Sequence, residues 1–129
     1  MSTHYVTDAP RRQAELLSYE AHPDYTRQID VLLAGAGSVR EVTIGRLVGR
    51  ITASGKLVAW APAANDGSET AAGVVLEDAQ AAVGADGQVL ILARGPAIVR
   101  RSELDYGGAT AGQIAAAEAA LLALGIRVR

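Results

Sequence analysis

The chain has 129 residues, a net charge of −2 and no cysteine, so we expect a single domain without disulfides or thiolate metal sites. It contains neither the basic stripe that a nucleic-acid clamp needs nor a run of about 20 apolar residues, so we expect no direct nucleic-acid contact and no membrane span. Half of the residues are apolar, but none is phenylalanine and one is tryptophan. Small side chains must therefore fill the core, and association with other subunits is expected to add stability.

Residues 1–28 differ from the rest of the chain, and we interpret them as an extended N-terminal arm. They contain Pro10, Pro23, both histidines and three of the four tyrosines, but no sustained helical or strand period. We expect a short helical turn at 13–17. A disordered tail is the alternative, and the tyrosines argue against it because disordered segments contain few aromatic residues. The polar start lacks the apolar run of a signal peptide, which predicts synthesis in a cytoplasm.

From residue 29 the sequence is typical of a β-rich domain, which we place at 29–129. Apolar and alternating runs predict strands, separated by turns that contain glycine. The 53–56 turn, with Gly55, predicts a hairpin, and the Asp86-Gly87 pair predicts another tight turn. The predicted β segments are 29–35, 40–52 with bends at Gly45 and Gly49, 56–60, 71–82, 89–95 and 97–104.

The last segment has a helical period. Thr110 and Gln113 have the spacing of a capping box, and Gly125 stands where a left-handed C-cap is expected. Apolar residues at steps of three and four predict one buried helical face, made of Ile114, Ala117, Leu121 and Leu124. The final residues then form a short strand. The predicted fold is mostly β, with one C-terminal helix.

The sequence offers no convincing catalytic, cofactor or metal site. The glycines of "VLLAGAGSVRE" suggest dinucleotide binding, but Arg40 replaces the third glycine and a strand-like segment follows. His4 and His22 lie 18 positions apart in the arm, too far apart for a typical zinc site, and we interpret them as exposed or interfacial. The acids near the histidines, Asp8, Glu20 and Asp24, are ordinary. In the domain, turns explain Asp66 and Asp86, and Glu77 and Asp78 are solvated residues at the end of a strand.

Two residues of the central segment allow more than one interpretation. Lys56 follows a hairpin turn, where lipoyl and biotinyl carriers place their modified lysine, but its neighbours Gly55 and Leu57 do not match carrier patterns. We favour an exposed lysine that keeps the hairpin soluble. Trp60 ends the next strand and is either a core residue or an interface anchor, since tryptophan is enriched at interface hot spots.

The central pattern resembles the tailed-phage head decoration proteins of the lambda type. The resemblance covers about residues 30–129 and includes the strand 89–99 with its Gly95, and the terminal helix. Its motif positions are Gly49, Gly55–Trp60, Asp66-Gly67 and Ala72–Leu76.

The resemblance implies a small β-clip or tulip-like domain with a structural role and no enzymatic activity. Members of the family form trimers at threefold positions on the expanded capsid and clamp the major capsid protein against internal DNA pressure. Their N-terminal arms contact the shell, in part by adding a strand, so this chain is expected to be a virion component on the capsid exterior. The candidate contact residues are Tyr5, Val6, Leu16, Leu17 and Tyr19. A carrier domain modified at Lys56 is the main alternative, and a small-ligand barrel is another.

Overall fold

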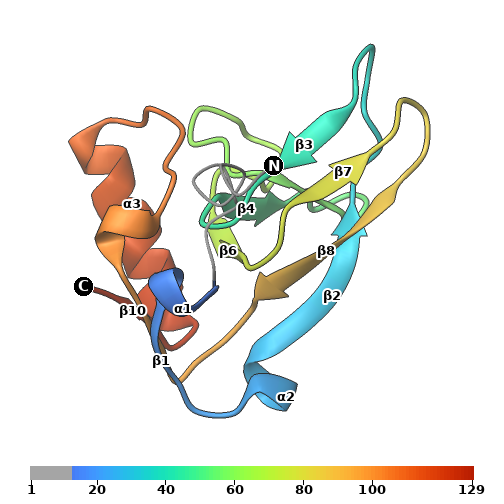
Figure 1. Ribbon diagram of the computed structural model, residues 1–129. Helices are drawn as coiled ribbons and strands as arrows, with labels where there is room; N and C mark the ends of the chain where they lie inside the picture. Colours follow the sequence, from blue (N-terminus) through green and yellow to red (C-terminus); the bar gives the residue numbers. More distant parts are fainter. Residues whose placement is uncertain (1–12) are drawn as a thin grey trace, which may run out of the picture.

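The computed structural model describes residues 13–129 and confirms the predicted class, a mostly β fold with a helix near the C-terminal end (Figure 1). The elements in chain order are α1 (Gln13–Leu16), β1 (Leu17–Glu20), α2 (Pro23–Thr26), β2 (Arg27–Leu32), β3 (Arg40–Val42), β4 (Leu47–Arg50), β5 (Leu57–Ala59), β6 (Ala71–Val75), β7 (Ala79–Ala81), β8 (Gly87–Leu92), β9 (Ala97–Val99), a 3-10 helix (Arg101–Glu103), α3 (Ala111–Ala123) and β10 (Ile126–Val128).

A closed five-stranded barrel forms the centre of the molecule, with strand order β2-β5-β4-β6-β8. Its longest pairing is antiparallel, between β2 and β8, and runs from Arg27 opposite Leu92 to Leu32 opposite Gly87. The strands β3 and β7 form a separate two-stranded ribbon that projects from the barrel (Figure 1). Aliphatic side chains alone fill the barrel cluster: Leu32, Val42, Val48, Leu57, Val75, Ala81, Val89 and Ile91.

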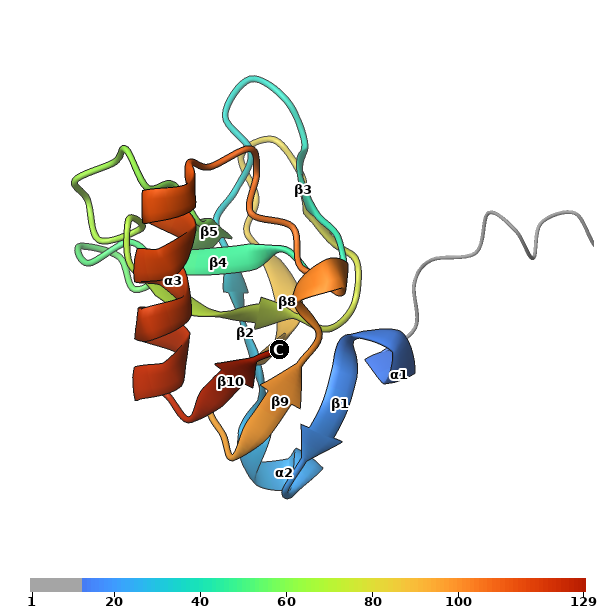
Figure 2. The same ribbon diagram turned by 90° about the vertical axis from the view of Figure 1, so that its left-hand side faces the viewer.

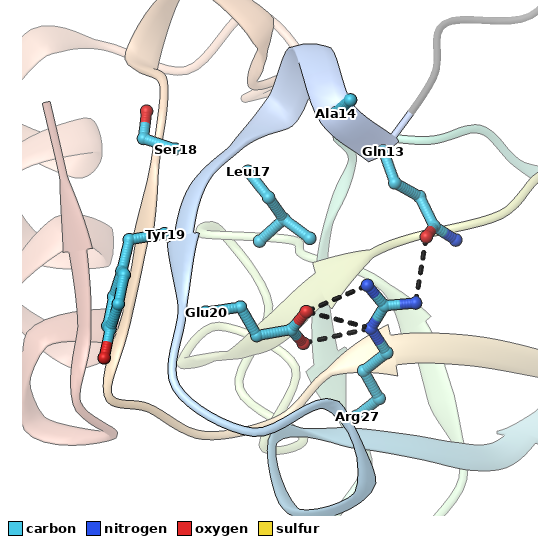
Figure 3. A pocket seen from close by; sticks show the side chains of 7 residues that line it. All are labelled: Gln13, Ala14, Leu17, Ser18, Tyr19, Glu20 and Arg27. Atoms are coloured by element: carbon cyan, nitrogen blue, oxygen red, sulfur yellow. Dashed lines mark hydrogen bonds and ion pairs between the residues drawn. The ribbon is translucent and has the colours of Figure 1, made fainter.

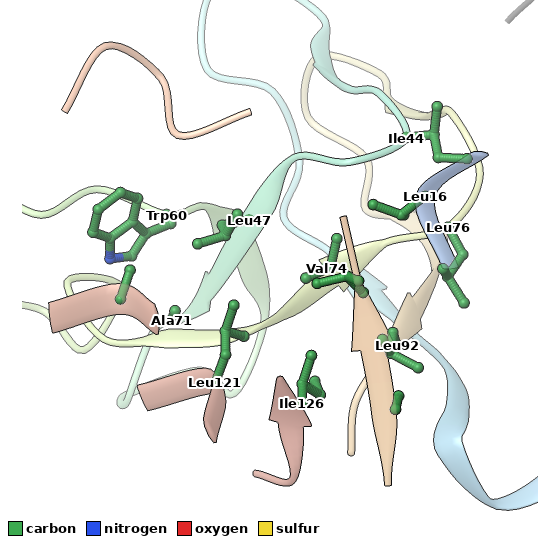
Figure 4. Close-up of a cluster of buried hydrophobic side chains, with 13 residues drawn as sticks. Leu16, Ile44, Leu47, Trp60, Ala71, Val74, Leu76, Leu92, Leu121 and Ile126 are labelled. Carbon is green, nitrogen blue, oxygen red and sulfur yellow. The ribbon is translucent and has the colours of Figure 1, made fainter. Parts of the chain in front are cut away.

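A three-stranded sheet, β1-β9-β10, packs with α3 against the barrel. The strand β9 is antiparallel to β1 and parallel to β10. In Figure 2, α3 stands along one side of the barrel, and β10, β9 and β1 follow one another away from it. A second and larger apolar cluster fills the space between these parts, including Leu16, Trp60, Leu121 and Ile126 (Figure 4). This cluster joins segments from both ends of the described chain into one unit.

The predicted hairpin is confirmed, but two predicted strands are each divided. The strands β4 and β5 pair antiparallel, and Gly55 adopts a φ of 74° in the turn that joins them. The expected strand 40–52 is interrupted by a turn in which Gly45 has a φ of 92°. The expected strand 71–82 breaks between β6 and β7, and each half joins a different sheet. The tight turn predicted at Asp86-Gly87 lies earlier, because Gly84 has the left-handed backbone and Gly87 begins β8.

The helix α3 begins with the predicted capping box. The Thr110 hydroxyl accepts a hydrogen bond from the Gln113 amide, and the Gln113 side chain accepts one from the Thr110 amide. Gly125, with a φ of 89°, ends the helical segment and leads into β10. Of the predicted helical face, Ala117 and Leu121 are buried, whereas Leu124 is 37% exposed.

Thr110→Ala is expected to lower the free energy of unfolding by about 1 kcal/mol, because it removes the acceptor for an amide at the start of the helix. Urea denaturation measures the change. Thr110→Ser keeps the hydroxyl and should stay close to the wild type. Equal losses in both variants would show that the cap does not stabilise α3.

The boundary predicted at residue 28 differs from the structure, in which the chain already belongs to the packed unit from residue 13. Leu16 and Thr26 are buried, with exposures of 1% and 0%. The strand β1 pairs with β9, and β2 begins at Arg27 as part of the barrel. Residues 13–28 are therefore an integral part of the domain.

Candidate functional site

The structure describes three of the five predicted contact residues, and these three differ in exposure. Tyr5 and Val6 lie outside the described residues. Leu16 is 1% exposed and packs in the larger core cluster, so it offers no surface to a partner. Leu17 is half-buried against the same cluster, whereas the side chain of Tyr19 is 52% exposed. The fold-back of β1 onto β9 explains the difference, because it turns one side of the segment inward.

A polar network holds β1 against the barrel (Figure 3). The Arg27 guanidinium donates to both carboxylate oxygens of Glu20, with a shortest distance of 2.8 Å, and to the Gln13 side chain at 2.9 Å. The Thr26 hydroxyl donates to Glu20 at 2.5 Å. Gln13 in turn donates to the carbonyl of Leu76 on the barrel side. In Figure 3, Leu17 and Glu20 point toward Arg27, while Tyr19 lies on the other side of β1.

The hydrogen bond from Arg27 holds the pKa of Glu20 below its ordinary value of 4.5, against the opposing effect of burial. The Glu20 side chain is 8% exposed, so the charged form depends on these partners. Since the folded state binds the proton less readily than the unfolded state, the network stabilises the fold above pH 4.5. This stabilisation is lost as the pH falls through the lowered pKa.

Glu20→Gln is expected to lower the free energy of unfolding at pH 7 by about 1–3 kcal/mol, because it removes a charged acceptor from a partly buried arginine. The difference in free energy of unfolding between the wild type and the variant should then narrow as the pH falls below about 4.5. Urea denaturation at a series of pH values measures both effects. Glu41→Gln, at an exposed position of β3, is the control and should change little. A difference that stays constant down to pH 3 would contradict the assignment.

An apolar groove lies on the outer face of the three-stranded sheet. The residues Tyr19, Ile98 and Arg127 are register partners on β1, β9 and β10, so their side chains form one row across the sheet. Pro96 and Leu122 line the groove beside this row. Leu122 is 53% exposed at the C-terminal end of α3, so the groove presents apolar surface to solvent.

The position of α3 beside this groove is fixed by Glu118. Its carboxylate accepts hydrogen bonds from Arg101, at 2.9 Å, and from the Tyr106 hydroxyl, at 2.6 Å. The bond from Arg101 lowers the pKa of Glu118, while burial and the Glu118 carboxylate raise the pKa of Tyr106. Glu118 lies one helical turn before Leu122. Its contacts tie α3 to the segment that precedes the helix.

Trp60 is a core residue in this structure. Its side chain is 2% exposed, and its indole N–H donates to the Glu69 carbonyl at 2.8 Å. The ring of Tyr106 meets it edge to face, with a centroid distance of 6.5 Å. Of the two interpretations that the sequence left open, the structure supports core packing.

Lys56 does not project freely from the hairpin. Its ammonium group forms a 2.7 Å ion pair with Asp86, which also accepts from the Ala34 amide. This contact joins the β4–β5 hairpin to the turn before β8 and explains both residues structurally. An intact-mass measurement that shows an added group after co-expression with lipoyl and biotinyl ligases would revive the carrier interpretation.

No cluster of three or more histidine or acidic side chains within residues 13–129 has the arrangement of a metal site. His4 lies outside the described residues, and His22 precedes α2 as its N-cap residue. None of the helices in the described part is long and apolar enough to cross a membrane.

The model of one protein family, the bacteriophage lambda head decoration protein D, matches residues 6–126. The chain belongs to this family. The match extends over nearly the whole sequence and includes residues of the N-terminal segment that the motif resemblance did not reach. A comparison with curated proteins gives no match. Membership makes this chain a phage head decoration protein, in a family of structural capsid components.

Sequence reasoning found Tyr19 but missed the other residues of the groove. The missed signal is an alternation: apolar inner residues at 97 and 99 flank Ile98, and those at 126 and 128 flank Arg127. Such alternation assigns Ile98 and Arg127 to an outer sheet face. These two residues lie beside Tyr19 because β1 pairs with β9, about 80 residues further along the sequence. No local pattern reveals such a pairing.

Proposed function

We propose that this head decoration protein binds the outside of the expanded phage capsid as a homotrimer at threefold positions and stabilises the shell against the pressure of packaged DNA. Its partners are the major capsid protein and two further copies of itself, and it has no catalytic role. The observation that carries the proposal is the family match over residues 6–126. The exposed aromatic side chain of Tyr19 and the apolar groove beside it supply surface suited to such a partner.

We further propose that the chain before residue 13, with Tyr5 and Val6, contacts the shell. Each main-chain hydrogen bond of an added strand contributes about 1 kcal/mol net, whereas ordering a residue costs about 1–2 kcal/mol of backbone entropy. One such segment is therefore near balance by itself. Three of them on one trimer bind together, because the first attachment raises the effective concentration of the others.

Co-sedimentation of the purified protein with expanded shells of its own phage tests the proposal. We expect the protein in the pellet, three copies for each threefold position, and a trimer mass by light scattering on or off the shell. Protein that stays in the supernatant, while the same shells bind a different encoded protein, would overturn it.

A further inference from the structure

The outer face of the β1-β9-β10 sheet carries three arginines besides its apolar groove. Arg127 lies in the row with Tyr19 and Ile98. Arg100 and Arg129 follow one residue after β9 and β10, where strand alternation places them on the same face. The backbone ladder continues there, since the Arg129 amide donates to the Val99 carbonyl at 2.9 Å. All three arginines are exposed.

No carboxylate within residues 13–129 forms an ion pair with any of these three arginines. Elsewhere in that range Arg40 and Arg94 also lack a carboxylate partner, and their guanidinium groups donate to carbonyl and amide oxygens. The guanidinium of Arg100 donates to a backbone carbonyl, that of Glu15. By contrast, an acidic side chain pairs with each of Arg27, Arg46, Arg50 and Arg101.

The strands themselves supply no acid to neutralise this face. Glu20 is the one acidic residue in β1, β9 and β10, and it turns inward to Arg27. The chain as a whole carries a net charge of −2, so the concentration of unpaired guanidinium groups here is a local feature. Arginine suits carboxylates because its planar fork donates two parallel hydrogen bonds to them.

We propose, on the basis of the function proposed above, that this face docks a segment of the capsid protein that carries an apolar side chain next to aspartate or glutamate. The apolar side chain fills the groove between Tyr19 and Leu122, and the carboxylates meet Arg127 and its two neighbouring arginines. A nucleic-acid backbone would satisfy the arginines but leave the adjoining apolar groove uncovered, so an acidic protein segment fits the whole face better.

Arg127→Gln and Tyr19→Ser test the two halves of this surface in co-sedimentation with expanded shells at several salt concentrations. We expect each variant to bind about tenfold more weakly than the wild type while it keeps its unfolding temperature. Binding by the wild type should weaken as salt rises, and Arg127→Gln should show a shallower dependence. Lys56→Gln and Val83→Ser are the matched controls, since they remove one cation and one exposed apolar side chain near the turn that precedes β8, outside the β1-β9-β10 sheet.

Each other outcome identifies a different error. Shells that bind no wild-type protein contradict the proposed function itself. Wild-type binding that both variants retain, or that the controls weaken equally, overturns the proposed surface. A loss of trimer mass in Tyr19→Ser or Arg127→Gln would assign the face to a second copy instead. Binding of the wild type to a short DNA duplex that Arg127→Gln abolishes would assign it to nucleic acid.

Discussion

Leu16→Ala is expected to lower the free energy of unfolding by about 2–5 kcal/mol, because it opens a cavity in the larger core cluster. The side chain is 1% exposed and packs in the same cluster as Leu121 and Ile126 at the other end of the chain. A loss of this size is a large share of the 5–15 kcal/mol that stabilises a typical domain. Chemical denaturation of the purified variant measures it.

Tyr19→Ser is the matched control, since Tyr19 lies three residues away and the substitution truncates a side chain that is already 52% exposed. It should unfold within about 0.5 kcal/mol of the wild type. A stable Leu16→Ala variant with weakened shell attachment would show instead that Leu16 contacts the capsid. Deletion of residues 1–28 cannot make this distinction, because it removes Leu16, Thr26 and the start of β2 from the fold.

Trp60→Ala is expected to cost about 3–5 kcal/mol of stability, since it removes the largest side chain of the core cluster. The edge-to-face contact with Tyr106 is lost as well, and the Glu69 carbonyl loses its hydrogen-bond donor. Thermal and urea unfolding measure the change. If Trp60 were a capsid anchor, the variant would stay stable and release the shell.

Trp60→Phe separates packing from hydrogen bonding at the same position. It keeps an aromatic ring but loses the indole N–H, so we expect a smaller loss than in the alanine variant. An equal loss in both variants would show that the bond to the Glu69 carbonyl, at 2.8 Å, dominates the contribution of Trp60.

The parts of the fold with strong local signals were predictable from the sequence. The capping box at Thr110, the left-handed Gly125 and the hairpin around Gly55 each depend on neighbouring residues, and each is present. The divided strands were not predictable, because the break between β6 and β7 depends on which sheet each half joins. Alternation of apolar residues continues across that break and conceals it.

The N-terminal segment shows why tertiary contacts override weak local patterns. The helices α1 and α2 have four residues each, too short for a hydrophobic period to develop. Leu16 becomes a core residue through pairing of β1 with β9, far away in the sequence. The sequence shows four arginines near the C-terminal end, but it does not show which of them has a carboxylate partner. Arg101 forms an ion pair because α3 places Glu118 beside it, whereas the other three arginines form none within residues 13–129.

Heat disruption of expanded shells, with and without added protein, tests most directly whether this protein reinforces the capsid. Bare shells should break at a higher temperature after the wild-type protein is added. The rise in disruption temperature should be smaller when Arg127→Gln or Tyr19→Ser is added at equal concentration. Shells that bind the wild-type protein in full yet break at an unchanged temperature would contradict a stabilising role.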